Sequence, residues 1–397
     1  MTQRTLNKQE KVFLFLYFLL TVGFYRSELL PVINLVYYLM LGVFTYSLFK
    51  SKLFLHSDYI KISTLFLIYA FTSIFWADSF DFAFSNYLEL LKNIILSIVI
   101  ISFCKNNNDT YFILKSLAFS GIIFCIISFS RFEDLTTAII KGFRPYKEDE
   151  LNLNLLGSIA SISSIVFLFS TFVEKKKWYL VIFAISIILV FLTGSRKSII
   201  AVFLGLLYFL FNAKINFKFY VLILVLMIGV LISIYTKEYS NAIMENLADL
   251  IGIISPNKVL GESDTIRLGM LESALNHFLT SPLIGNGYFS FPILYAKETG
   301  QQTYAHNNYL EILSDIGIIG FVLFYMYFFL MIHRAKRSIS MGKQTLINAL
   351  LIMTLFNQLA IVILGDRFSW ILLSIIFAGT KFSNFKINEN KFLNEQH

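Results

Sequence analysis

The chain has 397 residues, of which 57% are hydrophobic and only 15% are charged. Soluble domains carry about 45–50% hydrophobic and about 25% charged residues. A soluble globule of this size could not cover so much apolar surface, which includes 43 phenylalanines. Two cysteines are too few for a disulfide scaffold. The composition excludes an ordinary cytosolic enzyme and a disordered chain, and it indicates an integral membrane protein. The net charge of +8 is no sign of nucleic-acid binding, because basic residues must first be sorted by side of the membrane.

The apolar runs predict an all-α membrane protein with about twelve transmembrane helices, since a span needs about 20 mostly apolar residues. The predicted spans are 11–25, 31–49, 60–77, 86–104, 110–129, 153–173, 178–194, 196–212, 217–235, 308–332, 345–364 and 367–380. Only a tight break separates the seventh span from the eighth. There Thr193-Gly194-Ser195 supplies turn and N-cap residues.

Lysine and arginine gather on alternate connections between these spans. The short connections and tails on one side are basic, as in 175–177 and 334–343, whereas the other side spreads its basic residues over two long loops. By the positive-inside rule, the basic side is cytoplasmic. Both termini then lie in the cytoplasm, which agrees with an even number of spans.

The long outer loops set the domain organisation. We predict spans 1–9 in residues 1–235, a loop subdomain in 236–307, spans 10–12 in 308–380 and a tail in 381–397. Apolar periodicity predicts amphipathic helices at 241–254 and 264–279, both suited to lie along the membrane surface. Asn308 and Glu311 are spaced like the N-cap and third residue of a capping box for the next span.

Three stretches on the predicted outer face resemble a known family. They are Thr193-Gly194-Ser195-Arg196 at the start of a span, Arg267 on a loop helix before Pro282-Leu283-Ile284-Gly285-Asn286-Gly287, and His306-Asn307-Asn308-Tyr309-Leu310-Glu311 followed by Gly317 and Gly320. Over residues 186–333 their order resembles the O-antigen polymerase and O-antigen ligase family of bacterial envelope glycosyltransferases. The resemblance implies a GT-C-like enzyme of the bacterial inner membrane with a large periplasmic loop between spans 9 and 10. Members transfer glycans from undecaprenyl diphosphate without a metal or other cofactor.

The chemistry of the residues fits this resemblance. A diphosphate leaving group needs its charge neutralised, and the guanidinium groups of Arg196 and Arg267 can each bind two phosphate oxygens. Arg196 also begins a helix, whose N-terminus favours anions. The acceptor hydroxyl must lose a proton, and His306 is the candidate general base because the following helix N-terminus keeps its ring neutral.

Other interpretations of these residues stay open. Either arginine could instead contact lipid phosphate or solvent, and His306 could be an ordinary loop histidine. Further candidates for the site are Arg367, Asn307 and Glu311. An ion pair with Asp366 or a place at the membrane interface would also explain Arg367, and helix capping would also explain Asn307 and Glu311. No cluster has metal-ligand spacing. The acidic run 148–150 could bind a divalent ion, but exposed acidic runs are more often simply solvated.

We therefore predict a polymerase of lipid-linked repeat units that makes O-antigen or a related polysaccharide. Its expected partners are an undecaprenyl-diphosphate-linked glycan donor and acceptor, membrane lipids and a chain-length regulator, with no nucleic acid. One alternative is an O-antigen ligase that transfers the glycan to lipid A-core. Another is a transporter or flippase, for which Glu89, Lys92 and Lys115 supply charges inside spans. Pairing of Glu89 with Lys92 and an inward-reaching Lys115 would argue against a transport pathway.

Overall fold

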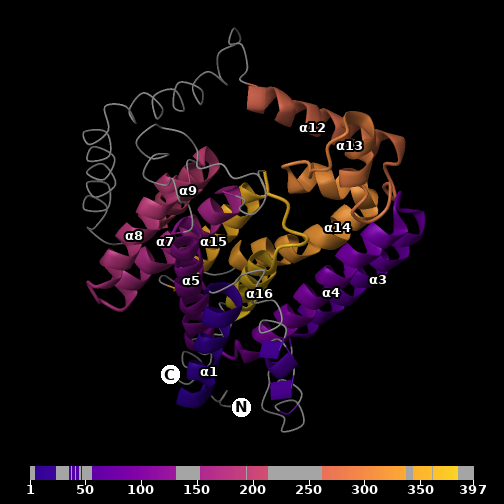
Figure 1. Cartoon of the computed structure of the whole chain (residues 1–397). Coiled ribbons are helices and arrows are strands. Elements are labelled where there is room, and N and C mark those ends of the chain that lie inside the picture. The colour runs from indigo at the N-terminus through magenta and orange to yellow at the C-terminus, as the bar shows by residue number, and fades with distance from the viewer. Residues whose placement is uncertain are drawn as a thin grey trace.

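The structure is a computed structural model. It describes residues 5–23, 35–36, 38–40, 42–43, 46, 56–130, 153–193, 195–212, 262–336, 343–359 and 361–382. Its regular elements are all helical (Figure 1). The predicted span 217–235, the helix 241–254, the acidic run 148–150, the tail beyond residue 382 and most of the predicted span 31–49 lie outside these residues.

Ten of the twelve predicted spans coincide with helices in this described part of the chain. The elements are α1 (Lys8–Phe18), the π-helical η1 (Leu19–Gly23), α3 (Ser57–Ser73), the 3-10 helix η3 (Ile74–Trp76), α4 (Phe80–Phe103), α5 (Asn107–Phe129), α7 (Leu153–Val173), α8 (Tyr179–Leu192), α9 (Arg196–Asn212), α12 (Glu262–Thr280), α13 (Phe291–Thr299), α14 (Asn308–Lys336), α15 (Lys343–Asn357) and α16 (Arg367–Phe382). Within the described residues, five helices are long and apolar enough to cross a membrane, and α8 and α9 are shorter apolar helices.

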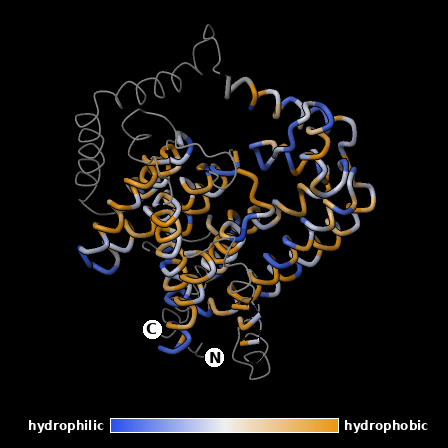
Figure 2. The backbone as a smooth tube through the Cα atoms, in the orientation of Figure 1, coloured by the Kyte–Doolittle hydropathy of each residue, from blue (hydrophilic) through white to orange (hydrophobic). Residues whose placement is uncertain are grey.

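Large apolar side chains cover much of the outside of the bundle. The exposed set includes Leu65, Ile68, Phe71 and Phe75 beside Phe80, Phe84 and Leu88, and it continues with Val181, Ile185, Ile188, Ile318, Ile319, Val322 and Phe329. Figure 2 shows hydrophobic segments along the bundle helices and hydrophilic ones mainly near helix ends and around α12 and α13. Soluble proteins rarely expose apolar surface on this scale, so these faces contact lipid.

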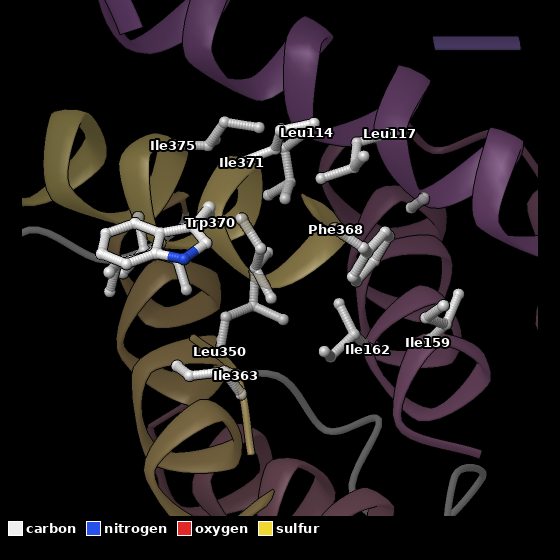
Figure 3. Close-up of a cluster of buried hydrophobic side chains, with 14 of the residues drawn as sticks. Leu114, Leu117, Ile159, Ile162, Leu350, Ile363, Phe368, Trp370, Ile371 and Ile375 are labelled. Carbon is white, nitrogen blue, oxygen red and sulfur yellow. The ribbon is translucent and has the colours of Figure 1, made fainter. Parts of the chain in front are cut away.

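The core lies where α5, α7, α15 and α16 pack together (Figure 3). Trp370 is among the largest fully buried side chains, and its indole nitrogen donates to the Leu364 carbonyl oxygen over 2.9 Å. Its ring also contacts Phe66 of α3 and Phe324 of α14. Trp370 therefore fixes the start of α16 against helices from distant parts of the chain.

Hydrogen bonds bring the starts of α7, α9 and α14 and the end of α15 to one end of the bundle. The Ser195 hydroxyl donates to Asn154 Oδ1 over 3.2 Å, and Asn357 Nδ2 donates to the Ser158 hydroxyl over 2.7 Å. The Asn308 amide donates to the Gln358 carbonyl oxygen over 2.8 Å. We call this the His306 end, because His306 lies two residues before the start of α14.

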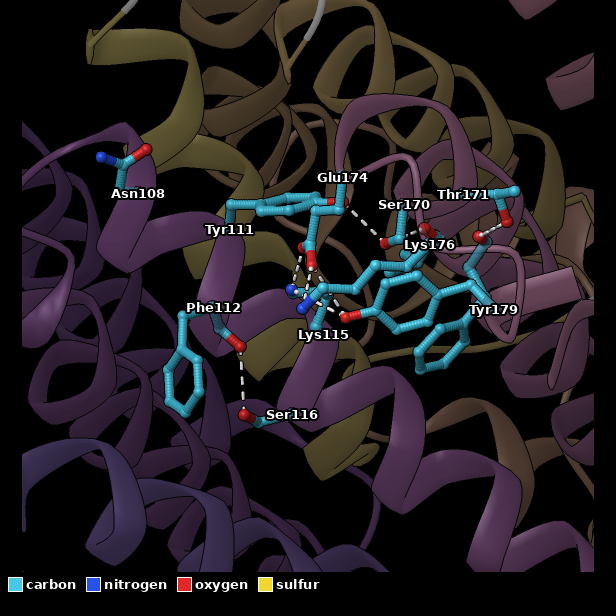
Figure 4. Close-up of polar contacts among 12 residues, drawn as sticks. Asn108, Tyr111, Phe112, Lys115, Ser116, Ser170, Thr171, Glu174, Lys176 and Tyr179 are labelled. Atoms are coloured by element: carbon cyan, nitrogen blue, oxygen red, sulfur yellow. Dashed lines mark hydrogen bonds and ion pairs between the residues drawn. The ribbon is translucent and has the colours of Figure 1, made fainter. Parts of the chain in front are cut away.

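The opposite end carries ion pairs of residues from the predicted basic side. Arg334 lies 2.7 Å from Asp58, and Lys115 pairs with Glu174 just beyond α7. Figure 4 shows this second cluster, in which the Tyr179 hydroxyl donates to Glu174 Oε2 over 3.0 Å. Lys115 thus reaches toward a helix end, as predicted. Away from this end, within α4, Glu89 and Lys92 also pair as predicted, over 2.6 Å.

A break in α14 shapes the His306 end. Gly317 has a φ of 62° and a ψ of −169°, which interrupts the helix. The loop 282–287 bonds with the backbone on both sides of the break: Ile318 N donates to the Pro282 oxygen over 2.9 Å, and Gly287 N donates to the Asp315 oxygen over 2.7 Å. A Cβ at Gly285 would lie 2.3 Å from the Asp315 oxygen. The glycine-rich motif therefore docks the outer subdomain onto α14. We use this name for α12, α13 and the connections around them, residues 262–307.

The structure corrects several predicted boundaries. Helix α4 begins at Phe80, six residues earlier than predicted, and α12 begins at Glu262 rather than 264. Helix α15 ends at Asn357 instead of 364, because the following residues leave the helix and bond with Asn308. The short helix α13 was not predicted, since its nine residues are too few for a clear apolar period.

We expect Gly317→Ala to lower the stability of the protein by at least about 2 kcal/mol, since a positive φ outside glycine and overpacking each cost about 1–3 kcal/mol. Its Cβ would lie 2.4 Å from the Leu283 oxygen. The control is Gly269→Ala on α12, where a Cβ meets open space and should be neutral or stabilising. Thermal unfolding in detergent checks both variants, and equal melting temperatures would contradict this account of the break.

Candidate functional site

His306 lies between α13 and α14, in a connection held by a small hydrophobic core. This core contains Met270 and Ala274 of α12, Phe291 and Tyr295 of α13, and Ala305 directly before the histidine. Helices α12 and α13 therefore pack against the segment that carries His306. The apolar residues at 270 and 274 lie one helical turn apart, so they share the inner face of α12.

Three hydrogen bonds fix the backbone on either side of His306. The Ala305 amide donates to Glu311 Oε2 over 2.6 Å, and Asn307 Oδ1 accepts from the Tyr309 and Leu310 amides over 3.0 and 3.1 Å. Between them His306 adopts a φ of 53°. That left-handed conformation costs a non-glycine residue about 1–2 kcal/mol. The neighbouring bonds hold the histidine in this orientation.

The predicted capping box of Asn308 and Glu311 is wrong. Asn307 caps α14, while Asn308 is the first helical residue and is fully buried. Asn308 Nδ2 donates to Gln358 Oε1 over 2.8 Å, and its Oδ1 accepts from the Ile363 amide over 3.0 Å. The side chain therefore faces the connection between α15 and α16, and Glu311 turns back to Ala305 instead of to the cap.

One buried face of α14 also holds the start of α13. Asp315 lies one turn after Glu311, and its Oδ1 accepts from the Phe291 amide at the start of α13 over 2.7 Å. Both carboxyl side chains are fully buried. The remaining oxygens, Glu311 Oε1 and Asp315 Oδ2, make no hydrogen bond with the residues that the structure describes, and neither does the buried Tyr288 hydroxyl.

The His306 ring is kept neutral by its surroundings. Burial, followed by the positive charges of Arg267 and Lys197, lowers the pKa of His306 from 6.5 to about 4. The Tyr304 ring lies beside it, with centroids 4.1 Å apart. The buried Nδ1 makes no hydrogen bond within the described part of the chain. At neutral pH the imidazole can therefore accept a proton.

The charges that act on His306 come from two different helices. Arg267 is half-buried on α12, and Lys197 lies in the first turn of α9, where its Nζ donates to the Leu359 oxygen over 3.4 Å. Arg267 is thus close enough to His306 for its charge to act on the imidazole ring. The sequence analysis missed Lys197, although it directly follows Arg196 in the motif.

Arg196 is the first residue of α9, and its side chain lies outside the described atoms. Ser195 caps this helix, as predicted, because its hydroxyl accepts from the Ser198 amide over 3.4 Å. A helix N-terminus carries free N–H groups and a positive dipole end. The start of α9 therefore presents positive charge at the His306 end.

Arg367 begins α16 and lines a cavity whose lining does not include His306. Within the described ranges, no group of three or more His, Cys, Asp or Glu side chains is arranged to hold a metal ion. The site brought together by the structure thus consists of one neutral histidine with two cationic side chains. Such a group can accept a proton at His306 and neutralise an anion at Arg267 and Lys197.

Comparison with known proteins supports the family resemblance. A family profile described as O-antigen ligase matches residues 181–325, from α8 to the broken helix α14. A search of curated proteins found no match to the chain. The matched segment contains Arg196, Lys197, Arg267 and His306, together with the loop that docks onto α14. The match supports the resemblance carried by the motifs: residues 181–325 of this all-helical membrane protein are similar to the family described as O-antigen ligase.

Proposed function

We propose that the protein polymerises undecaprenyl-diphosphate-linked oligosaccharide repeat units into O-antigen or a related surface polysaccharide. The observation that carries this proposal is a buried, neutral His306 next to the positive charges of Arg267 and Lys197. The proposed setting is a GT-C-like glycosyltransferase with twelve spans in the bacterial inner membrane. Both termini are then cytoplasmic, and the His306 end faces the periplasm.

In the proposed reaction, His306 takes the proton from a sugar hydroxyl of the acceptor repeat unit. The hydroxyl oxygen attacks the anomeric carbon of the donor glycan, and the bond from that carbon to the phosphate oxygen breaks. The electron pair leaves with undecaprenyl diphosphate. The proton stays on His306 until it is lost to solvent, and the acceptor glycan grows by the transferred chain.

The cationic residues act on the leaving group. Negative charge develops on the phosphate oxygen as the bond breaks, so a positive group placed there lowers the barrier. Arg267 and Lys197 take this role, joined by Arg196 and the N-terminus of α9. A guanidinium contributes two parallel hydrogen bonds to phosphate, which a point charge does not.

The family name favours a second candidate, an O-antigen ligase that transfers the same donor glycan to lipid A-core. Purified protein in nanodiscs should be given lipid-linked repeat units with and without lipid A-core. Longer lipid-linked chains support the polymerase, whereas glycan attached only to lipid A-core supports the ligase. Movement of the donor across a vesicle membrane without any covalent change would contradict both and support a flippase.

His306→Ala should reduce transfer about 10²–10⁴-fold, the usual cost of losing a general base. A base must be unprotonated, and a pKa of about 4 keeps the ring neutral to well below pH 6. The wild-type rate should therefore fall only as the pH drops through about 4. Lys197→Gln removes a positive charge that lowers the pKa of His306. The rate of this variant should therefore begin to fall at a higher pH than the wild-type rate, so the acid limb of its rate–pH profile is shifted.

Rate–pH profiles in nanodiscs check both expectations. The control for His306→Ala is His333→Ala, an exposed histidine near the far end of the same helix. Transfer by the His306→Ala variant within about threefold of wild type would remove His306 from the reaction. An acid limb near pH 6.5 in the wild type would contradict the neutral ring.

Arg267→Lys and Arg196→Lys should both be strongly impaired, because lysine keeps the charge but loses the paired hydrogen bonds. Arg334→Lys, in an ion pair with Asp58 at the opposite end, is the matched control and should transfer normally. EDTA should leave wild-type transfer unchanged, since the cationic side chains neutralise the diphosphate. Full activity of both lysine variants would contradict the assignment of Arg196 and Arg267 to diphosphate binding. Activity that is lost with EDTA and restored by a divalent ion would contradict it as well.

A further inference from the structure

A second polar site lies between α4, α5, α7 and the start of α16. It is a cavity of about 180 Å³ next to the π-helical η1. Glu89 and Asn93 of α4 line it, together with Asp366 and Arg367 at the start of α16. The lining also includes Phe124 and Phe368. A cavity this large holds roughly six water-sized volumes, so a single ring-sized polar group can enter it.

The position of Glu89 argues for a binding role. Charged residues inside a membrane-spanning helix are costly and usually mark a functional site. Glu89 lies nine residues after the start of α4 and pairs with Lys92 over 2.6 Å. Both members of this pair have side chains about half exposed, at 49% and 46%. Only Glu89 lines the cavity, which makes its carboxyl group available to an occupant from one side.

The mixture of groups indicates what the cavity binds. Two carboxyl groups, an amide and a guanidinium offer both acceptors and donors, whereas the site around His306 offers cations. The carboxyl groups of Glu89 and Asp366 disfavour a second diphosphate. Polar groups together with the rings of Phe124 and Phe368 in one lining suit a sugar, whose hydroxyls form hydrogen bonds and whose C–H face packs on aromatic rings.

The cavity is tied to the segment that carries His306. The Ile363 amide donates to Asn308 Oδ1 over 3.0 Å, and Asn93 Nδ2 donates to the Gly365 oxygen over 3.1 Å. Arg367 follows Ile363 by four residues, which span at most about 14 Å when extended. The connection from Ile363 to Arg367 therefore links the cavity to the His306 end.

We infer that this cavity is a subsite for a sugar ring of the acceptor glycan. The inference rests on the proposed function, in which the donor diphosphate binds Arg267 and Lys197. With one acceptor sugar held by Glu89, Asn93 and Asp366, a sugar further along the same chain can place its hydroxyl at His306. The subsite selects the acceptor by sugar shape, separately from the diphosphate.

The test uses full-length protein in nanodiscs and, as probe, the free repeat-unit oligosaccharide released by mild acid from lipid-linked repeat units. This probe lacks the lipid and the diphosphate. Glu89→Gln should weaken its binding at least tenfold, measured by saturation-transfer NMR titration. Lys92→Gln is the matched control, because it breaks the same ion pair from a position outside the cavity lining, and it should bind like wild type. A second variant, Phe124→Leu, should also weaken binding, and melting temperatures check folding.

The outcomes separate this inference from the proposed function. Equal binding by the Glu89→Gln and Lys92→Gln variants, or no probe binding by wild type, overturns the subsite. In transfer assays that vary one substrate while the other is saturating, Glu89→Gln should raise the KM for the oligosaccharide acceptor and leave the KM for the lipid-linked donor unchanged. A raised donor KM instead would contradict an acceptor subsite. Probe binding that depends on Glu89 in a protein without any transfer activity would uphold the sugar site and reject the transferase.

Discussion

A hydrogen bond from the Ala305 amide to the buried Glu311 carboxyl group fixes the segment on which the candidate site depends. Burying a carboxyl group is costly unless it is hydrogen-bonded, so Glu311 on the fully buried face of α14 must be matched by groups from the outer subdomain. The Ala305 amide is such a group, and it orients the peptide that precedes His306. Burial and the positive charges of Arg267 and Lys197, which come from different helices, then keep the histidine ring neutral.

The same helix connects this bond to the membrane-embedded bundle. Beyond Asp315, which holds the start of α13, α14 breaks at Gly317 and offers backbone groups to the loop 282–287. Helix α14 thus exposes apolar residues such as Val322 and holds the outer subdomain through buried polar residues such as Asp315. This arrangement places the candidate site at the end of the bundle and leaves the lipid-facing sides apolar.

Apolar run length predicted where most of the described helices lie, because a membrane requires about 20 apolar residues whatever their order. The motifs likewise indicated His306 and Arg267, which the structure brings near each other. Long-range contacts could not be predicted: the break at Gly317 forms only because loop 282–287 docks there, and α15 ends early because Asn308 bonds with the residues that follow it. Two adjacent asparagines can each cap a helix, so the sequence could not select Asn307. Lys197 was missed because its role depends on which side of α9 faces His306.

The central claim is that Glu311 positions His306 through the Ala305 amide, and amide hydrogen exchange with a transfer assay tests it most directly. Glu311→Gln keeps an oxygen that accepts this N–H, so exchange at Ala305 and the transfer rate should stay near wild type. Glu311→Ala should speed exchange at residues 304–306 and reduce transfer at least tenfold. Asp315→Asn serves as the control on the next turn and should leave exchange at Ala305 unchanged. Loss of transfer in the Gln variant with slow exchange at Ala305, or normal transfer by Glu311→Ala, would contradict the account.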